Sequence, residues 1–126
     1  MKTEQTLSGR IGVVTGATAG IGLAIAQELV MAGASVVVNG RREAKLREVL
    51  SELGERAHGV AGDAADETVI TRMLDEARAR FGGGTREADL VVVNAGRGLA
   101  GSVVTSDTSQ WEEMIRTNLL GAARLI

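Results

Sequence analysis

Three glycines within one short segment are the clearest chemical feature of this sequence. Gly16, Gly20 and Gly22 lie in TGATAGIG, residues 15–22, between an apolar run and a segment with helical spacing. Glycine has no Cβ atom, so a ligand can approach its backbone closely, and the free amides of a helix start attract an anion. The glycines could instead serve only to form a tight turn. Their position between a strand and a helix favours a site for a pyrophosphate group.

Other polar residues could act with this segment. Asp63 and Asn94 each follow an apolar run, although they could also be an ordinary loop carboxylate and a turn residue. Asn118 lies on or beside the apolar stripe of the last helix, where an unpartnered amide costs about 1 to 3 kcal/mol. It is therefore either satisfied within the helix or directed at an active site. His58, the only histidine, is predicted to be structural rather than catalytic.

The spacing of apolar residues divides the chain into alternating strands and helices. Short β-branched runs predict strands at residues 10–15, 35–40, 56–63 and 89–96, the last of them apolar on both faces. Apolar residues three and four positions apart predict helices at 20–32, 42–53, from an N-cap at Asp66 to about 81, and from 107 or 108 onward. The expected apolar stripes include Ile21, Ala24, Ile25 and Leu29 in the first helix, and Trp111, Ile115, Leu119 and Ala122 in the last.

Repeated strand–helix units with connections of this length predict a parallel sheet covered by helices on both faces. The expected fold class is α/β, a doubly wound, Rossmann-like sheet with strand order 3-2-1-4. The sequence has no proline and no low-complexity tract to mark a boundary. We therefore expect residues 1–126 to form one dinucleotide-binding domain.

Four motifs in order resemble the short-chain dehydrogenase/reductase family. TGATAGIG is similar to the family's T-G-x-x-x-G-x-G cofactor loop, and NAG at 94–96 resembles its N-N-A-G, with Val93 in place of the first Asn. Asp63 resembles the family's aspartate at the adenine. Asn118, in MIRTNLLGA, is similar to a catalytic Asn that orders a water in a proton relay.

The resemblance implies hydride transfer between a nicotinamide and a carbonyl or alcohol, in homotetramers or dimers that pack through the last helix. It implies a small-molecule substrate, no metal, and Asn118 as the catalytic residue within this chain. The expected cofactor-binding residues are Gly16, Thr18, Gly20, Ile21, Gly22, Arg41, Arg42, Asp63, Ala64, Asn94, Ala95 and Gly96.

The end of the second strand indicates which cofactor is bound. In a sheet of this type an acidic residue there binds the ribose 2′-hydroxyl of NAD. This chain has Gly40 instead, followed by Arg41 and Arg42. A guanidinium bound to a phosphate gains roughly 1.5 to 3 kcal/mol. We therefore predict NADP, with NAD disfavoured, and Arg41 as the main phosphate ligand; the alternative for the arginine pair is a solvated helix start.

The rest of the family's catalytic machinery cannot be placed. The family's chemistry uses a Tyr, a Lys four residues later and a Ser, whereas this chain has no tyrosine and its lysines are Lys2 and Lys45. We expect the chain to be the N-terminal half of a longer enzyme, inactive alone, with its C-terminal half as a possible separate partner. The loop at 97–104 would form only one wall of the substrate pocket.

Composition excludes several other classes. The chain has 14 Lys and Arg against 16 Asp and Glu and no basic run longer than two residues, which argues against nucleic acid as a partner. It has no cysteine, hence no disulfides or thiol catalysis, and no apolar run that could span a bilayer. We expect a soluble, cytoplasmic protein.

Two other functions remain open at this stage. The chain could be a non-catalytic dinucleotide-binding module or sensor fragment whose occupancy signals to a partner. It could also be a structural fragment that binds no cofactor and assembles through its open sheet edge and last helix.

Overall fold

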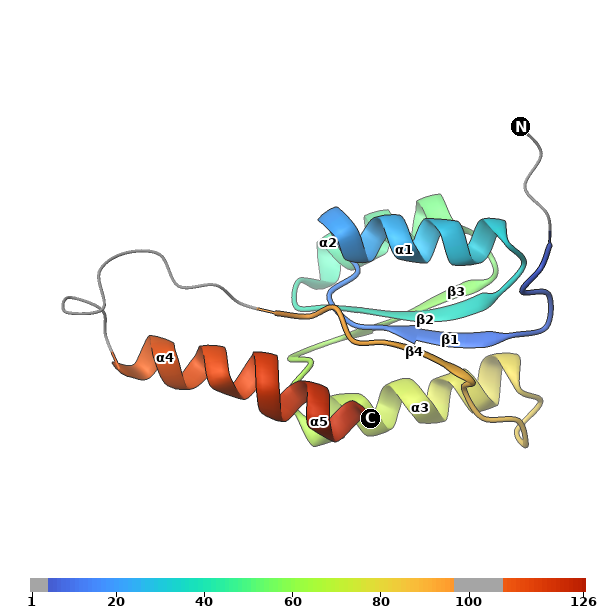
Figure 1. The fold of residues 1–126 in the computed structure, drawn as a ribbon. Helices are drawn as coiled ribbons and strands as arrows, with labels where there is room; N and C mark the ends of the chain where they lie inside the picture. Colours follow the sequence, from blue (N-terminus) through green and yellow to red (C-terminus); the bar gives the residue numbers. More distant parts are fainter. Residues whose placement is uncertain (1–4, 97–107) are drawn as a thin grey trace.

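A parallel β-sheet runs through the centre of the computed structural model, which describes residues 5–96 and 108–126 (Figure 1). Within these ranges the sheet contains β1 (Ile11–Val14), β2 (Ser35–Gly40), β3 (Ala57–Ala61) and β4 (Leu90–Val92). The strands are all parallel and their order is β3-β2-β1-β4. The predicted α/β class and the predicted strand order are confirmed.

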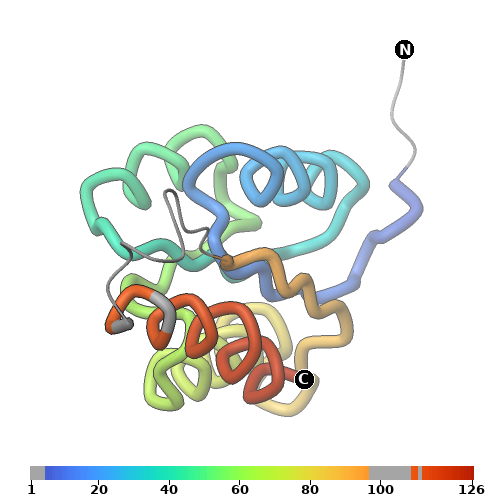
Figure 2. The backbone as a smooth tube through the Cα atoms, turned by 60° about the vertical axis from the view of Figure 1, so that its left-hand side comes forward, coloured from blue at the N-terminus to red at the C-terminus, as the bar shows by residue number. Residues whose placement is uncertain are grey.

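Helices lie on both sides of the sheet (Figures 1 and 2). On one side are α1 (Gly20–Met31) and α2 (Glu43–Leu53). On the other side are α3 (Glu67–Phe81) and α5 (Ala122–Leu125), and α5 continues the line of α4 (Thr108–Ile115) and the π-helical η1 (Arg116–Gly121). The expected start of this last helix at 107 and the loop at 97–104 lie outside the described residues.

The central strand β2 supplies side chains to two apolar cores. Val36 and Val38 face one core and Val37 faces the other, and all three are fully buried. Parallel strands covered on both faces are apolar throughout for this reason. The core under α1 and α2 contains Val14, Ala17, Ala26, Val36, Val38, Leu46, Val49 and Leu53. The core under α3 and α5 contains Ile11, Val13, Val37, Val60, Val69, Ile70, Met73, Ala77 and Leu125.

Strand β4 differs most from its expected form. The sequence predicts a strand at 89–96 buried on both faces, but β4 is Leu90–Val92 and Val91 is 45% exposed. Among the described strands β4 pairs with β1 alone, which leaves its outer side open. Beyond it, the backbone amides of Asn94 and Ala95 bond to the Thr15 hydroxyl instead of a neighbouring strand.

Two predicted apolar stripes are only partly correct. In α1 the predicted Leu29 packs against the core, but the fully buried residues are Gly22 and Ala26, and Ile21 is 74% exposed. This helix turns Gly22 toward the carbonyl of Gly16, so the buried face is displaced by one residue.

In the last helix Ile115 and Leu119 are exposed and Ala122 is half-buried, while the side chain of Trp111 lies outside what the structure describes. The buried residues described there are Thr117, Gly121 and Leu125. Gly121 faces the loop after β3, since a Cβ atom there would lie 3.0 Å from Ala65. A regular helical repeat cannot anticipate this face, because η1 has a wider turn than an α-helix.

The predicted N-cap of α3 is confirmed. The Asp66 Oδ1 atom accepts hydrogen bonds from the Thr68 amide (2.9 Å) and the Thr68 hydroxyl (2.7 Å). These hydrogen bonds from Thr68 lower the pKa of Asp66. A carboxylate in this position satisfies an amide that the helix itself leaves without a partner.

Replacing Asp66 by Ala removes this cap, and we expect the Tm to fall by about 2 to 4 °C at neutral pH. Because the folded-state pKa is lowered, the contribution of the cap is present above the ordinary carboxyl pKa and is lost as the pH falls through the lowered value. Thermal unfolding monitored by circular dichroism across this pH range measures both effects. The control is Asp75→Ala, which removes an exposed carboxylate from the middle of α3. Equal changes in Tm for the two variants would contradict the capping role.

Candidate cofactor-binding site

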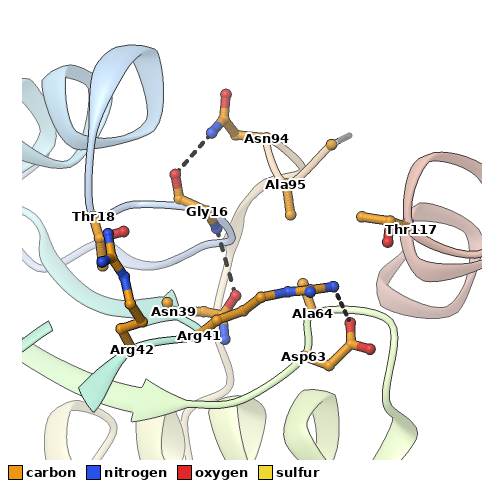
Figure 3. A pocket seen from close by; sticks show the side chains of 12 residues that line it. Gly16, Thr18, Asn39, Arg41, Arg42, Asp63, Ala64, Asn94, Ala95 and Thr117 are labelled. Atoms are coloured by element: carbon orange, nitrogen blue, oxygen red, sulfur yellow. Dashed lines mark hydrogen bonds and ion pairs between the residues drawn. The ribbon is translucent and has the colours of Figure 1, made fainter. Parts of the chain in front are cut away.

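A pocket of about 390 Å³ opens where the strands end (Figure 3). Its walls come from the loop after β1, the end of β2, the loop after β3, the segment after β4, and η1. Most of the residues expected to bind a cofactor line this one pocket: Gly16, Thr18, Arg41, Arg42, Asp63, Ala64, Asn94, Ala95 and Gly96. The carboxyl ends of parallel strands are where doubly wound sheets bind ligands.

The β1–α1 loop is held by close backbone contact at two glycines. Gly16 has a φ of +63°, and a Cβ atom on it would lie 2.9 Å from the Cα of Ala95. A Cβ atom on Gly22 would collide with the carbonyl oxygen of Gly16 and with the side-chain amide of Asn94. The glycine spacing is therefore required by the shape of the loop itself, in addition to any ligand.

The end of β4 is joined to this loop by hydrogen bonds. The Asn94 side chain donates from Nδ2 to the Gly16 carbonyl at 2.9 Å. The hydroxyl of Thr15 accepts from the backbone amides of Asn94 (3.1 Å) and Ala95 (3.0 Å). Thr15 is 2% exposed and does not line the pocket, but it fixes the backbone that does.

Asn39 is a lining residue that the sequence prediction missed. It is 2% exposed, and its Nδ2 atom donates to the carbonyls of Val60 and Gly62, each at 3.1 Å. Its Oδ1 atom accepts from the Gly16 amide at 3.5 Å. An amide directly after three valines in a buried strand must have such partners, so its position in the sequence was a usable signal.

One end of the pocket is suited to phosphate groups. Helix α1 begins after Ala19, which provides no side-chain cap, and its first turn contains no acidic residue. The free amides and the positive dipole end of α1 therefore face the loop. No capping side chain and no acidic residue of the first turn would compete with a bound anion there. Arg41 and Arg42 line the same pocket from the end of β2. This donor set fits a dinucleotide that carries several phosphates.

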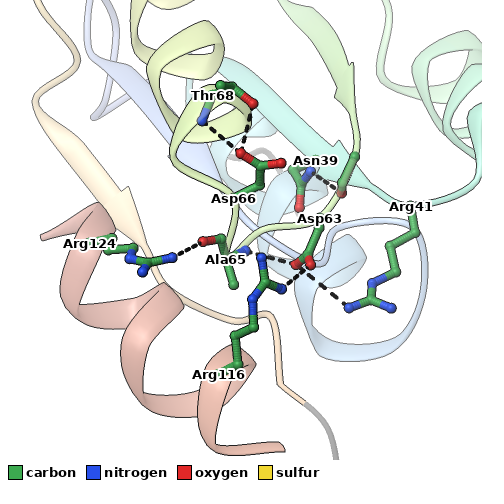
Figure 4. A network of polar contacts seen from close by, with 9 residues as sticks. Asn39, Arg41, Asp63, Ala65, Asp66, Thr68, Arg116 and Arg124 are labelled. Carbon is green, nitrogen blue, oxygen red and sulfur yellow. Dashed lines mark hydrogen bonds and ion pairs between the residues drawn. The ribbon is translucent and has the colours of Figure 1, made fainter. Parts of the chain in front are cut away.

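Asp63 lines the same pocket and lies at the centre of a polar network (Figure 4). Its Oδ1 atom accepts from the Ala65 amide at 2.9 Å, and its Oδ2 atom accepts from Arg116. Partial burial alone would raise the pKa of Asp63, but the hydrogen bonds from Ala65 and Arg116 and the charges of Arg116 and Arg41 lower it overall. The carboxylate is therefore ionised at neutral pH.

Some predicted residues lie beside the pocket rather than in its lining. Gly20, Ile21 and Gly22 form the start of α1, and the side chain of Ile21 points to solvent. Asn118 is an exposed residue of η1, not a member of the apolar stripe, and its Oδ1 atom is 3.1 Å from where a Gly96 Cβ atom would lie. Asn118 thus borders the end of the pocket at Gly96.

Thr117 is a second missed lining residue. It is 5% exposed, and within the described part of the chain its hydroxyl oxygen has no hydrogen-bond partner. Nothing in the local sequence distinguishes Thr117, because only the wide turn of η1 directs it at the pocket.

His58 lies away from the pocket, on β3. Its Nε2 atom is 3.3 Å from Glu76 on α3. Burial, followed by the charge of Arg80, lowers the pKa of His58 despite the nearby glutamate.

Across residues 5–96 and 108–126, no group of three or more His, Cys, Asp or Glu side chains is arranged to hold a metal ion. In the same ranges, no helix has both the length and the apolar character needed to cross a membrane.

Two curated relatives match most of this chain in sequence. The chain is 34% identical over 121 residues to a 3-oxoacyl-(acyl-carrier-protein) reductase from Salmonella typhimurium, and the aligned region covers 96% of this chain and 48% of the relative. It is 38% identical over 116 residues to a serine 3-dehydrogenase from Rhizobium radiobacter, covering 91% of this chain and 45% of the relative. The chain therefore spans about half the length of these curated relatives.

A solved structure has the same fold. The crystal structure of a 3-ketoacyl-(acyl-carrier-protein) reductase from Brucella melitensis, complexed with NADH, matches with a TM-score of 0.86 at 28% identity. The match covers 94% of this chain and 48% of that one. The sequence model described as short chain dehydrogenase matches residues 10–126. Because this match includes nearly the whole sequence, the chain belongs to the short-chain dehydrogenase family.

Proposed function

We propose that this chain is the cofactor-binding half of an NADP-dependent oxidoreductase that acts on a carbonyl or alcohol substrate. The observation that carries the proposal is the pocket itself. It combines a glycine loop at an uncapped helix start, two arginines at the end of β2, and an ionised aspartate after β3. The bound nicotinamide would supply or accept hydride.

Each group of residues would bind a different part of the cofactor. The amides at the start of α1 would bind the pyrophosphate, and Arg41, with Arg42 beside it, would bind the 2′-phosphate. Asp63 would accept a hydrogen bond from the adenine. The backbone of Ala95 and Gly96, fixed by Thr15 and Asn94, would lie along the cofactor.

The neighbouring structure contains NADH, but the end of β2 in this chain argues for NADP. The position that would bind a ribose 2′-hydroxyl through an acid is Gly40, which is buried beside Thr18. Arg41 is half exposed at the pocket and has donors available to a phosphate.

The remaining chemistry would come from elsewhere in the enzyme. The chain has no tyrosine to act as the acid and spans about half of its relatives, so we propose that a further segment supplies the Tyr, Lys and Ser. Residues 1–126 would then act as one cofactor-binding domain in a cytoplasmic homo-oligomer. Three large apolar residues on the outer face of the last helix, Ile115, Leu119 and Leu120, are at least 44% exposed and would be covered by another copy or segment.

A non-catalytic dinucleotide-binding module is the second candidate. The pocket could bind a cofactor without catalysing hydride transfer, because that step also needs a proton donor. A measurement of NADPH turnover distinguishes these two candidate functions. An enzyme oxidises NADPH in the presence of small carbonyl compounds, whereas a module binds NADPH and shows no turnover with any of them in the fully assembled protein.

Replacing Arg41 by Ala should weaken NADPH binding by about tenfold or more, because a charge-assisted contact with the phosphate is lost. NADH binding should change by less than about twofold. Calorimetric titration of both cofactors measures the two dissociation constants. Lys45→Ala removes a positive charge from α2 outside the pocket lining and is the matched control. Equal losses for NADPH and NADH in Arg41→Ala would refute the phosphate role.

Replacing Asn118 by Ala should lower kcat by about 10²-fold in the complete enzyme, if the residue orders a water for proton transfer. The dissociation constant for NADPH should stay within about twofold, because Asn118 borders the pocket and does not line it. Steady-state kinetics and cofactor titration give the two values. Gln110→Ala changes another exposed amide of the same helix and should leave both unchanged. An unchanged kcat in Asn118→Ala would remove this residue from the mechanism.

A further inference from the structure

Asp63 lies between two arginines that come from different elements of the fold (Figure 4). Arg41 extends from the end of β2, and its Nη2 atom is 3.6 Å from the Asp63 Oδ1 atom, beyond hydrogen-bond distance. Arg116 extends from η1 and donates a hydrogen bond to the Oδ2 atom. One carboxylate thus faces two guanidinium groups, and only Arg116 is hydrogen-bonded to it.

This unequal pairing leaves charge available at Arg41. Attraction between charges falls with distance, so the carboxylate is mainly neutralised by the nearer Arg116. The third contact of Asp63, the Ala65 amide at 2.9 Å, holds the Oδ1 atom that lies nearest to Arg41. Arg41 therefore has no hydrogen bond to Asp63 that an incoming anion would need to replace.

The η1–α5 segment contacts the loop after β3 at several points besides the Arg116–Asp63 pair. Arg124 donates to the Ala65 carbonyl at 2.8 Å and lies 3.6 Å from Glu67. Gly121 packs against the backbone of Ala65. Two segments far apart in sequence are thus held together, and the Arg116–Asp63 pair forms within that contact (Figure 4).

We propose that Arg116 is a positioning residue for cofactor choice, which binds the Asp63 carboxylate and so leaves Arg41 to bind the 2′-phosphate of NADP. This inference rests on the proposed function above. Without Arg116, the half-exposed Arg41 side chain would turn to Asp63, and a phosphate would have to compete with a carboxylate for the same guanidinium. NADH, which has no 2′-phosphate, would be insensitive to this change.

The test compares NADPH and NADH binding in four forms of the full chain as isolated. These are the wild type, Arg116→Gln, Arg116→Lys and Arg124→Gln, with circular dichroism to verify equal folding. Arg124→Gln is the matched control, because it removes the same charge from the same helical segment and a tie to the same loop, without touching Asp63.

We expect Arg116→Gln to reduce the ratio of NADPH to NADH affinity by about two- to fivefold, the range for a partly exposed ion pair. Arg116→Lys should retain most of the preference because it keeps the charge, and Arg124→Gln should leave the ratio unchanged. The effect of Arg116→Gln should shrink in high salt. If Arg116 had only a structural role, Arg116→Gln would weaken the binding of both cofactors equally, and that result would overturn the inference.

A second pair of variants tests whether Arg116 acts through Asp63. In Asp63→Asn the competing carboxylate is absent, so adding Arg116→Gln should leave the NADPH to NADH ratio unchanged. A further loss of preference there would mean that Arg116 contacts the phosphate directly, against the inference. Wild-type chain that binds neither cofactor would overturn the proposed function as well, whereas a wild-type NADPH preference that survives Arg116→Gln would overturn this inference alone.

Discussion

One buried amide connects the ends of three strands, and the pocket depends on it. Asn39 is the next-to-last residue of β2, donates to two carbonyls at the end of β3, and accepts from the Gly16 amide beyond β1. Its own carbonyl accepts from Ala17 at 2.9 Å. If any one of these strand ends moved, a hydrogen bond of the buried amide would break and a buried polar atom would be left without a partner. The strand ends therefore have one stable arrangement. The loops that follow them, carrying Gly16, Arg41 and Asp63, start from fixed positions as a result.

The site divides into a rigid part and a part held by charge. Backbone contacts at Gly16 and Gly22 leave no room for any side chain, and Thr15 fixes the segment after β4. Around Asp63, by contrast, the side chains of Asp63, Arg41 and Arg116 are partly exposed and joined by ion pairs. Packed backbone resists displacement, whereas partly exposed ion pairs are weak and respond to salt. Recognition of a common dinucleotide framework therefore suits the first part, and discrimination between related cofactors suits the second.

The sequence predicts the fold and much of the pocket, because both depend on local pattern. Alternation of apolar runs predicted a doubly wound parallel sheet, for which the order 3-2-1-4 is the usual one. Residues at strand ends such as Gly16, Arg41 and Asp63 lie in one pocket because parallel strands end at one edge. Helix orientation was predicted less well. Ile21 and Leu119 are exposed because tertiary contacts at Gly22 and Gly121 decide which face is buried. Thr117 and the pairing of Asp63 with Arg116 could not be predicted, since both depend on η1 meeting a loop more than fifty positions earlier.

The contacts between the glycine loop and the end of β4 also bear on how the chain folds. Asn94 and Gly16 are separated by 78 positions, so their hydrogen bond requires a large loop closure, unlike the local contacts of α1 with β2. Contacts of long sequence separation form late, because the entropy of closure must be offset first. We expect the units from β1 to β3 to assemble before the pocket exists. A cofactor that binds only the finished pocket would then stabilise the last step of folding and slow unfolding from β4.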